Sequence, residues 1–98
     1  MQLTFNRLVQ KDLRGALSHY DNAVGPHLAR RFYDEFEELL AAIEMNPKRF
    51  HGVPGSAYRR ANFHSFPYHL LYRERPDGVR VLVLRHHRRH PDFGLERE

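Results

Sequence analysis

The sequence has no cysteine, and only two of its sixteen basic residues are lysine. Without cysteine the chain can form neither disulfides nor thiolate zinc sites, which fits a reducing cytosol. It contains no apolar run long enough to cross a bilayer, and residues 1–5 lack the charged start and long apolar core of a signal peptide. We therefore expect a cytoplasmic protein without a membrane partner.

At 98 residues the chain is near the lower limit at which one hydrophobic core suffices without disulfides or metals. We expect one domain over residues 1–98. The formal net charge of +4 is unevenly placed, because residues 1–49 hold seven basic and seven acidic residues, whereas residues 50–98 hold nine and five. The excess of positive charge therefore belongs to the second half.

Arginines are concentrated between Tyr58 and His90, a stretch that contains eight of them and only two carboxylates, Glu74 and Asp77. This stretch carries +6 before any histidine is counted. The planar guanidinium suits bidentate recognition of phosphate or carboxylate, and a field of this sign attracts phosphate or an acidic protein. A GC-rich genome would also favour arginine over lysine, although it would not cluster the arginines.

The first half predicts a short strand followed by two helices. Leu3 and Phe5 alternate with polar neighbours, as in a strand, and Asn6 is suited to cap a helix. Apolar residues then recur at helical spacing in two segments, which are separated by Gly25-Pro26 and stopped after Met45 by Asn46-Pro47. Because the link is so short, the helices should form an antiparallel hairpin. The two stripes are Leu13, Ala16, Leu17, Tyr20 and Val24, and Leu28, Phe32, Phe36, Leu39, Leu40 and Ile43.

The second half predicts a loop and then three strands. Residues 48–57 are rich in Gly and Pro without periodicity, residues 58–64 are extended, residues 68–74 alternate, and residues 79–84 are nearly all apolar. Pro76-Asp77-Gly78 provides the turn of an antiparallel hairpin, and the last four residues, 95–98, are expected to fray.

Together these segments predict an α+β domain with the order β-α-α-β-β-β. The helical hairpin should pack on one face of a curved antiparallel sheet of three to four strands, with the first strand added at an edge. In this arrangement the arginines load one edge of the sheet with cations.

Several short motifs occur in order over about ninety residues, and their combination is far more specific than any one of them. They are Asp12-Leu13, Ala29-Arg30-Arg31-Phe32 with Phe36, Asn46-Pro47, Tyr58-Arg59-Arg60, Phe66-Pro67-Tyr68 with Leu70-Leu71-Tyr72, Val83-Leu84-Arg85-His86, and Arg88-Arg89-His90-Pro91. In these motifs and in its predicted element order the chain resembles the RelE/ParE superfamily of type II toxin-antitoxin toxins, also labelled plasmid stabilisation proteins.

The resemblance implies a small growth-inhibiting toxin without a cofactor, neutralised by a cognate antitoxin whose acidic or amphipathic segment covers the basic face. Two activities diverge within the superfamily. The ParE-like branch inhibits DNA gyrase without being a nuclease, and the RelE-like branch cleaves messenger RNA on the ribosome. A homodimer, driven by apolar surface on the helices, or a higher-order toxin-antitoxin assembly is a further expectation.

RNA cleavage by a 2′-hydroxyl needs a proton acceptor, cations that hold the phosphate, and an acid for the leaving oxygen. A metal-independent nuclease of this kind would use Arg59, Arg85, His86 and Arg89. The RelE-like nucleases, however, carry strand lysines and a C-terminal tyrosine, or a Glu with His and Tyr. Here the predicted sheet has no lysine, no tyrosine follows Tyr72, and Phe93 cannot transfer a proton. The sequence therefore favours the ParE-like branch.

The residues expected to bind the target or the antitoxin are basic: Arg59, Arg60, Arg73, Arg85, His86, Arg88 and Arg89. Structural roles are the alternatives: His86 would donate to a backbone carbonyl and fix the C-terminal turn, and Arg89 would pair with Asp92 or a helix glutamate. Because Arg59 and Arg60 alternate across a strand, only one of them faces a given partner.

The histidines at positions 86, 87 and 90 have a spacing seen in metal sites, but the arginines beside them would repel a dication. We therefore expect no metal site. A third reading of the whole chain is a family member that keeps the fold without toxicity and serves only as an antitoxin-binding or basic binding module.

Overall fold

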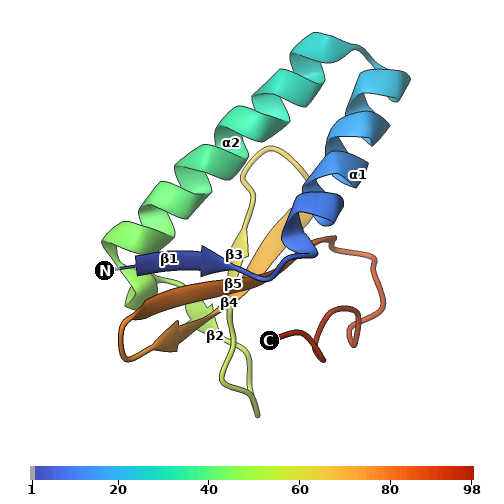
Figure 1. Cartoon of the computed structure of the whole chain (residues 1–98). Coiled ribbons are helices and arrows are strands. Elements are labelled where there is room, and N and C mark those ends of the chain that lie inside the picture. Colours follow the sequence, from blue (N-terminus) through green and yellow to red (C-terminus); the bar gives the residue numbers. More distant parts are fainter. Residues whose placement is uncertain (1) are drawn as a thin grey trace.

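The computed structural model describes residues 2–98, which form two helices packed on a five-stranded sheet (Figure 1). The predicted α+β class and element order are confirmed, with one additional short strand. In chain order the elements are β1 (Gln2–Phe5), α1 (Val9–Ala23), α2 (Pro26–Met45), a 3₁₀ turn (Pro47–Arg49), β2 (His51–Gly52), β3 (Arg59–Asn62), β4 (Tyr68–Arg75) and β5 (Gly78–His86).

The sheet has the strand order β1-β5-β4-β3-β2 and is mixed rather than wholly antiparallel. The first strand lies at an edge, as predicted, but it runs parallel to β5, with Leu3 opposite Val79. The additional strand, β2, falls in the predicted loop and pairs with Arg59 and Arg60 of β3. Two residues are too few to show a period-two pattern, so β2 could not be predicted from the sequence.

The helical hairpin is bounded where the sequence predicted. Helix α2 starts at Pro26 and ends at Met45, and only two residues, Val24 and Gly25, separate it from α1. The Asn6 side chain accepts the N–H of Leu8 at 2.9 Å, so Asn6 shapes the turn just before α1 rather than capping its first residue. Among residues 2–98, neither helix is long and apolar enough to cross a membrane.

The main core lies between the helices and one face of the sheet. Phe32 and Ile43 of α2 are fully buried against Leu70 and Tyr72 of β4 and Val81 of β5. An aromatic cluster extends this core toward the hairpin link and consists of Tyr20, Phe32, Phe63, Phe66 and Tyr68. The apolar stripes of the sequence therefore form the core, except for Val24, which follows α1 and is 61% exposed.

The opposite face of the sheet is covered by residues 87–98, called here the C-terminal segment (Figure 1). Phe93 and Leu95 of this segment pack on the buried Leu71, Leu82 and Val83. Several polar contacts hold its last residues; among them, the Tyr58 hydroxyl donates to the Leu95 carbonyl at 2.8 Å, and the Arg97 guanidinium lies 2.6 Å from the Asp12 carboxylate. The prediction that residues 95–98 fray is therefore wrong.

A β-bulge near the middle of β5 decides which side chains face which side of the sheet. Leu71 lies opposite Val83 while the next residue, Tyr72, lies opposite Val81, so Leu82 is an extra residue on β5. Val81 and Leu84 both belong to the helix-side core, whereas Leu82 and Val83 both belong to the cluster under the C-terminal segment.

Candidate functional site

The basic motif at the end of β5 is divided between the two faces of the sheet. Because side chains alternate after the bulge, His86 follows Leu84 toward the helices, whereas Arg85 and His87 point toward the C-terminal segment. Neighbouring residues that the sequence grouped together thus belong to two different environments.

Arg85 is buried, with 9% of its surface exposed, and its guanidinium is used within the fold. Its Nε donates to His69 Nε2 at 2.9 Å, and its Nη1 donates to the carbonyls of Pro91 at 2.7 Å and Phe93 at 2.9 Å. These partners are neutral, and burial lowers the pKa of Arg85. Arg85 therefore fastens the C-terminal segment to the sheet, and a direct role in target binding stays a prediction.

His69 and His87 continue this network to the surface. Since His69 Nε2 accepts from Arg85, the ring carries its proton on Nδ1, which donates to His87 Nδ1 at 2.9 Å. The same His87 nitrogen lies 3.2 Å from Arg60 Nη2, which can only donate. Burial, reinforced by Arg60 and Arg85, lowers the pKa of His69 to about 3. His69 is therefore neutral at pH 7, and burial, reinforced by Arg60 and His86, also lowers the pKa of His87.

Sequence reasoning missed His69 as a residue of interest. A signal was present, because the alternation of β4 places His69 on the same face as Leu71, where a polar side chain needs a partner if that face is covered. The predicted architecture placed the helical hairpin on one face of the sheet and assigned nothing to cover the other, so His69 was not expected to be buried.

Arg59 and Arg60 point to opposite faces of β3, as predicted. The Arg59 side chain lies 3.1 Å from the Glu74 carboxylate and donates to the Phe50 carbonyl at 2.7 Å, so it ties β3 to β4 and to the segment after α2. Arg60 lies on the other face, where its Nε donates to Asn62 Oδ1 at 2.8 Å and its Nη2 lies 3.2 Å from His87 Nδ1.

Two of the three remaining predicted arginines, Arg73 and Arg88, lie apart from these networks. Arg73 of β4 sits directly opposite Arg80 of β5, and within residues 2–98 its buried Nε has no hydrogen-bond partner. Arg88 is exposed in the turn after β5, where its backbone N–H donates to His86 Nδ1 at 3.0 Å. The His86 ring thus fixes the C-terminal turn by accepting a backbone N–H, and not by donating to a carbonyl.

His86 and Arg89 meet at one cleft between α1 and the end of β5. The cleft has a volume of about 320 Å³ and is lined by Asp12, Gly15, Ala16, His19, Tyr68, Leu84, Arg85, His86 and Arg89. The His86 ring lies edge-on to Tyr68, with 5.1 Å between centroids. Arg89 Cζ lies 4.3 Å from the centroid of the Phe93 ring, and within residues 2–98 it makes no ion pair with Asp92 or any other carboxylate.

The four residues that a nuclease would need are not gathered at one point. Arg59 is engaged with Glu74 and does not line the cleft. Arg85 lines it, but its guanidinium donates to His69, Pro91 and Phe93 on the opposite side of the sheet from His86. Among residues 2–98 no group of three His, Cys, Asp or Glu side chains is placed to hold a metal ion.

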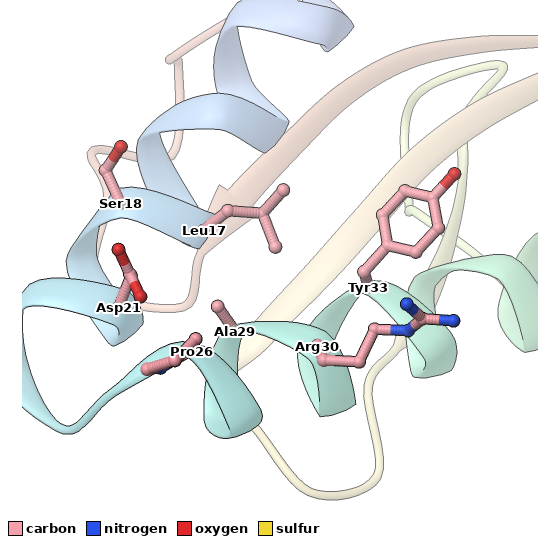
Figure 2. A pocket seen from close by; sticks show the side chains of 7 residues that line it. All are labelled: Leu17, Ser18, Asp21, Pro26, Ala29, Arg30 and Tyr33. Atoms are coloured by element: carbon pink, nitrogen blue, oxygen red, sulfur yellow. The ribbon is translucent and has the colours of Figure 1, made fainter.

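A second hollow, of about 450 Å³, lies between α1 and α2 near the hairpin link (Figure 2). Leu17, Pro26 and Ala29 form its apolar part, and Arg30, which is visible in the same view, is paired with Asp34 at 3.0 Å. Ser18, Asp21 and Tyr33 also line this hollow (Figure 2), but within residues 2–98 no hydrogen bond links their side chains, so the cleft beside His86 is the stronger candidate site.

The fold matches a solved structure described as the chromosomal ParDE TA system from P. aeruginosa, with a TM-score of 0.77. The two chains are 19% identical, and the match covers 88% of this chain and 95% of that chain. At this identity the likeness establishes a shared fold.

The family relationship comes from the sequence itself. Residues 3–91 match the family model described as the ParE toxin of the type II toxin-antitoxin system parDE, whereas no curated protein sequence matches the chain. The chain therefore belongs to the ParE toxin family, and the resemblance to the RelE/ParE superfamily is confirmed.

Proposed function

We propose that this chain is the toxin of a type II toxin-antitoxin pair, that it inhibits DNA gyrase, and that a cognate antitoxin neutralises it. The observation that carries the proposal is the match of residues 3–91 to the ParE toxin family, since this branch of the superfamily is the one that acts on gyrase. Such a toxin would act in the cytoplasm, where gyrase and its DNA are found.

The geometry of the basic residues supports binding over RNA cleavage. An acid, a base and two cations must surround one phosphate for cleavage to be efficient, and Arg59, Arg85 and His86 are held in three different environments. Arg60, Arg88 and Arg89 make no ion pair with a carboxylate of residues 2–98, and Arg88 is exposed. These three arginines are the ones we assign to contacts with the target or an acidic antitoxin segment.

Inducible expression in a bacterial host tests the proposal when growth, gyrase-linked DNA breaks and RNA 5′ ends are followed in the same cells. We expect growth arrest with DNA breaks and intact transcripts. The purified chain should also inhibit supercoiling by gyrase. Arg88→Glu should weaken this inhibition, since reversing a charge in a contact costs several-fold or more in affinity.

Arg31→Glu is the matched control, because Arg31 is an exposed arginine on α2, away from the basic motif. The free energy of unfolding of both variants should lie within about 0.5 kcal/mol of the parent value, as is usual for surface substitutions. Arrest with new cuts in translated messages would establish the RelE-like activity instead. Unimpaired growth would leave a non-toxic module that binds only an antitoxin.

A further inference from the structure

The cleft between α1 and the end of β5 has an opening that the fold itself does not require. Asp12, Gly15 and His19 of α1 share one helix face toward it, at the spacing i, i+3 and i+7. Glycine inside a helix costs about 0.5–1 kcal/mol relative to alanine. A Cβ built on Gly15 would meet nothing within 4 Å, so packing gives no reason for a residue without a side chain. Its absence leaves the cleft open.

The charges around the cleft favour an anion. The one carboxylate in the lining, Asp12, is already neutralised by Arg97 at 2.6 Å and by the N–H of Leu84 at 3.2 Å, and the Asp12 and Arg97 side chains are each only 7% exposed. Arg85 has neutral partners, and Arg89 stacks on a phenyl ring. Since the Arg85 guanidinium points to the other face of the sheet, the cleft itself holds one guanidinium charge, that of Arg89, which no carboxylate of residues 2–98 balances at ion-pair distance.

The lining also supplies hydrogen-bond donors that the fold leaves unused. His86 Nδ1 accepts the Arg88 N–H, so in the neutral ring the proton is on Nε2. The Tyr68 hydroxyl makes no hydrogen bond within residues 2–98, and burial raises its pKa, which keeps it protonated as a donor. Stacking on Phe93 holds the Arg89 guanidinium in one plane with its N–H edges free.

Positively charged, planar and preorganised donors are the groups that bind phosphate oxygens. The volume of about 320 Å³ lies at the lower end of small-molecule sites and admits a phosphate or a nucleoside monophosphate. We propose that this cleft is a binding site for a phosphate oxyanion, either inorganic phosphate or the phosphate of a nucleoside monophosphate. The proposal does not depend on gyrase inhibition.

Titration of the purified chain with inorganic phosphate and with AMP, followed by calorimetry and by amide chemical shifts, tests the assignment. We expect saturable binding, with the largest shifts at Gly15, His19, His86 and Arg89. Arg89→Gln should weaken binding about tenfold, because it removes a charge-assisted contact. Gly15→Phe should abolish binding by filling the cleft. Arg14→Gln, an exposed substitution one residue away on α1, is the control and should bind like the parent.

The two phosphate sources are separated by their affinities. AMP binding at least about tenfold tighter than phosphate would identify a nucleotide site, and equal binding would identify a site for the phosphate group alone. Either Arg89→Gln or Gly15→Phe suffices if the other fails to fold, which circular dichroism reports. The proposal is overturned if neither probe binds saturably, if both folded variants bind like the parent, or if acetate binds as well as phosphate.

Discussion

Acid should destabilise this fold through one buried imidazole. His69 is 1% exposed and must stay neutral to accept from Arg85 and donate to His87. Burial, followed by the positive charges of Arg60 and Arg85 and the neighbouring His87 and His86, lowers its pKa from 6.5 to about 3. Protonation would place a new N–H against the Arg85 guanidinium and break the hydrogen bond between them.

The sign and size of the effect follow from proton linkage. The folded-state pKa is lower than the unfolded value of 6.5, so the unfolded chain takes up the proton first as the pH falls. The contribution of His69 is fully present above the unfolded pKa and is lost progressively between pH 6.5 and about 3. Each pH unit in this window costs about 1.4 kcal/mol, so stability should fall by about 2 kcal/mol between neutral pH and about pH 5.

Urea unfolding, followed by circular dichroism at several pH values in this window, measures the slope. His69→Gln keeps an oxygen acceptor for Arg85 but cannot titrate. Unfolding of this variant should therefore take up one proton fewer in this pH window, so its free energy of unfolding should depend less steeply on pH. His51→Gln removes an exposed histidine of β2 and should keep the parent slope. If His69→Gln were as acid-sensitive as the parent, the neutral His69 network would be refuted.

Two further predictions concern the C-terminal segment. Arg97→Ala should cost about 3–5 kcal/mol because it leaves the Asp12 carboxylate buried and unpaired. Urea denaturation should show that adding Asp12→Asn recovers part of the loss, and strict additivity would mean that the two groups are not coupled. Gly94→Ala should cost more than Gly55→Ala in the same assay. Both glycines have left-handed φ angles, +83° and +75°, but only at Gly94 would a Cβ collide, 2.4 Å from Val83 Cγ2. Equal losses would contradict tight packing of the segment.

The helical hairpin could be predicted because its determinants are local. The apolar stripe of α2, the proline in its first turn and the Asn46-Pro47 stop all lie within or beside the helix they define. The parallel pairing of β1 with β5 has no such local cause. It joins residues more than seventy positions apart, and the direction of an edge strand is set by the partner it finds.

The C-terminal segment and the split site could not be predicted, since both depend on single tertiary events. One bulged residue, Leu82, shifts the alternation of β5, so that Arg85 rather than His86 faces the C-terminal segment, and no composition or periodicity marks it. The segment itself looks polar in sequence because its anchors are side chains such as Arg97 and backbone carbonyls such as that of Leu95. Counting charges reveals how many cations exist, but not which of them are already paired.

The structure explains why arginine rather than lysine occupies several of these positions. A guanidinium presents its N–H donors in a fixed plane, so Arg85 can bind an imidazole nitrogen with Nε and two backbone carbonyls with Nη1 in the same orientation. The ammonium group of lysine could not span these acceptors with the same geometry. Arg59 and Arg97 are likewise bound to both a carboxylate and a backbone carbonyl.

The basic surface available to a partner is therefore smaller than the sequence count implies. Substitutions at Arg59 and Arg85 would alter toxicity through folding, whereas those at Arg88 and Arg89 report on contacts made by the folded chain. Loss of activity at any arginine is informative about binding only when the unfolding free energy of the same variant is unchanged.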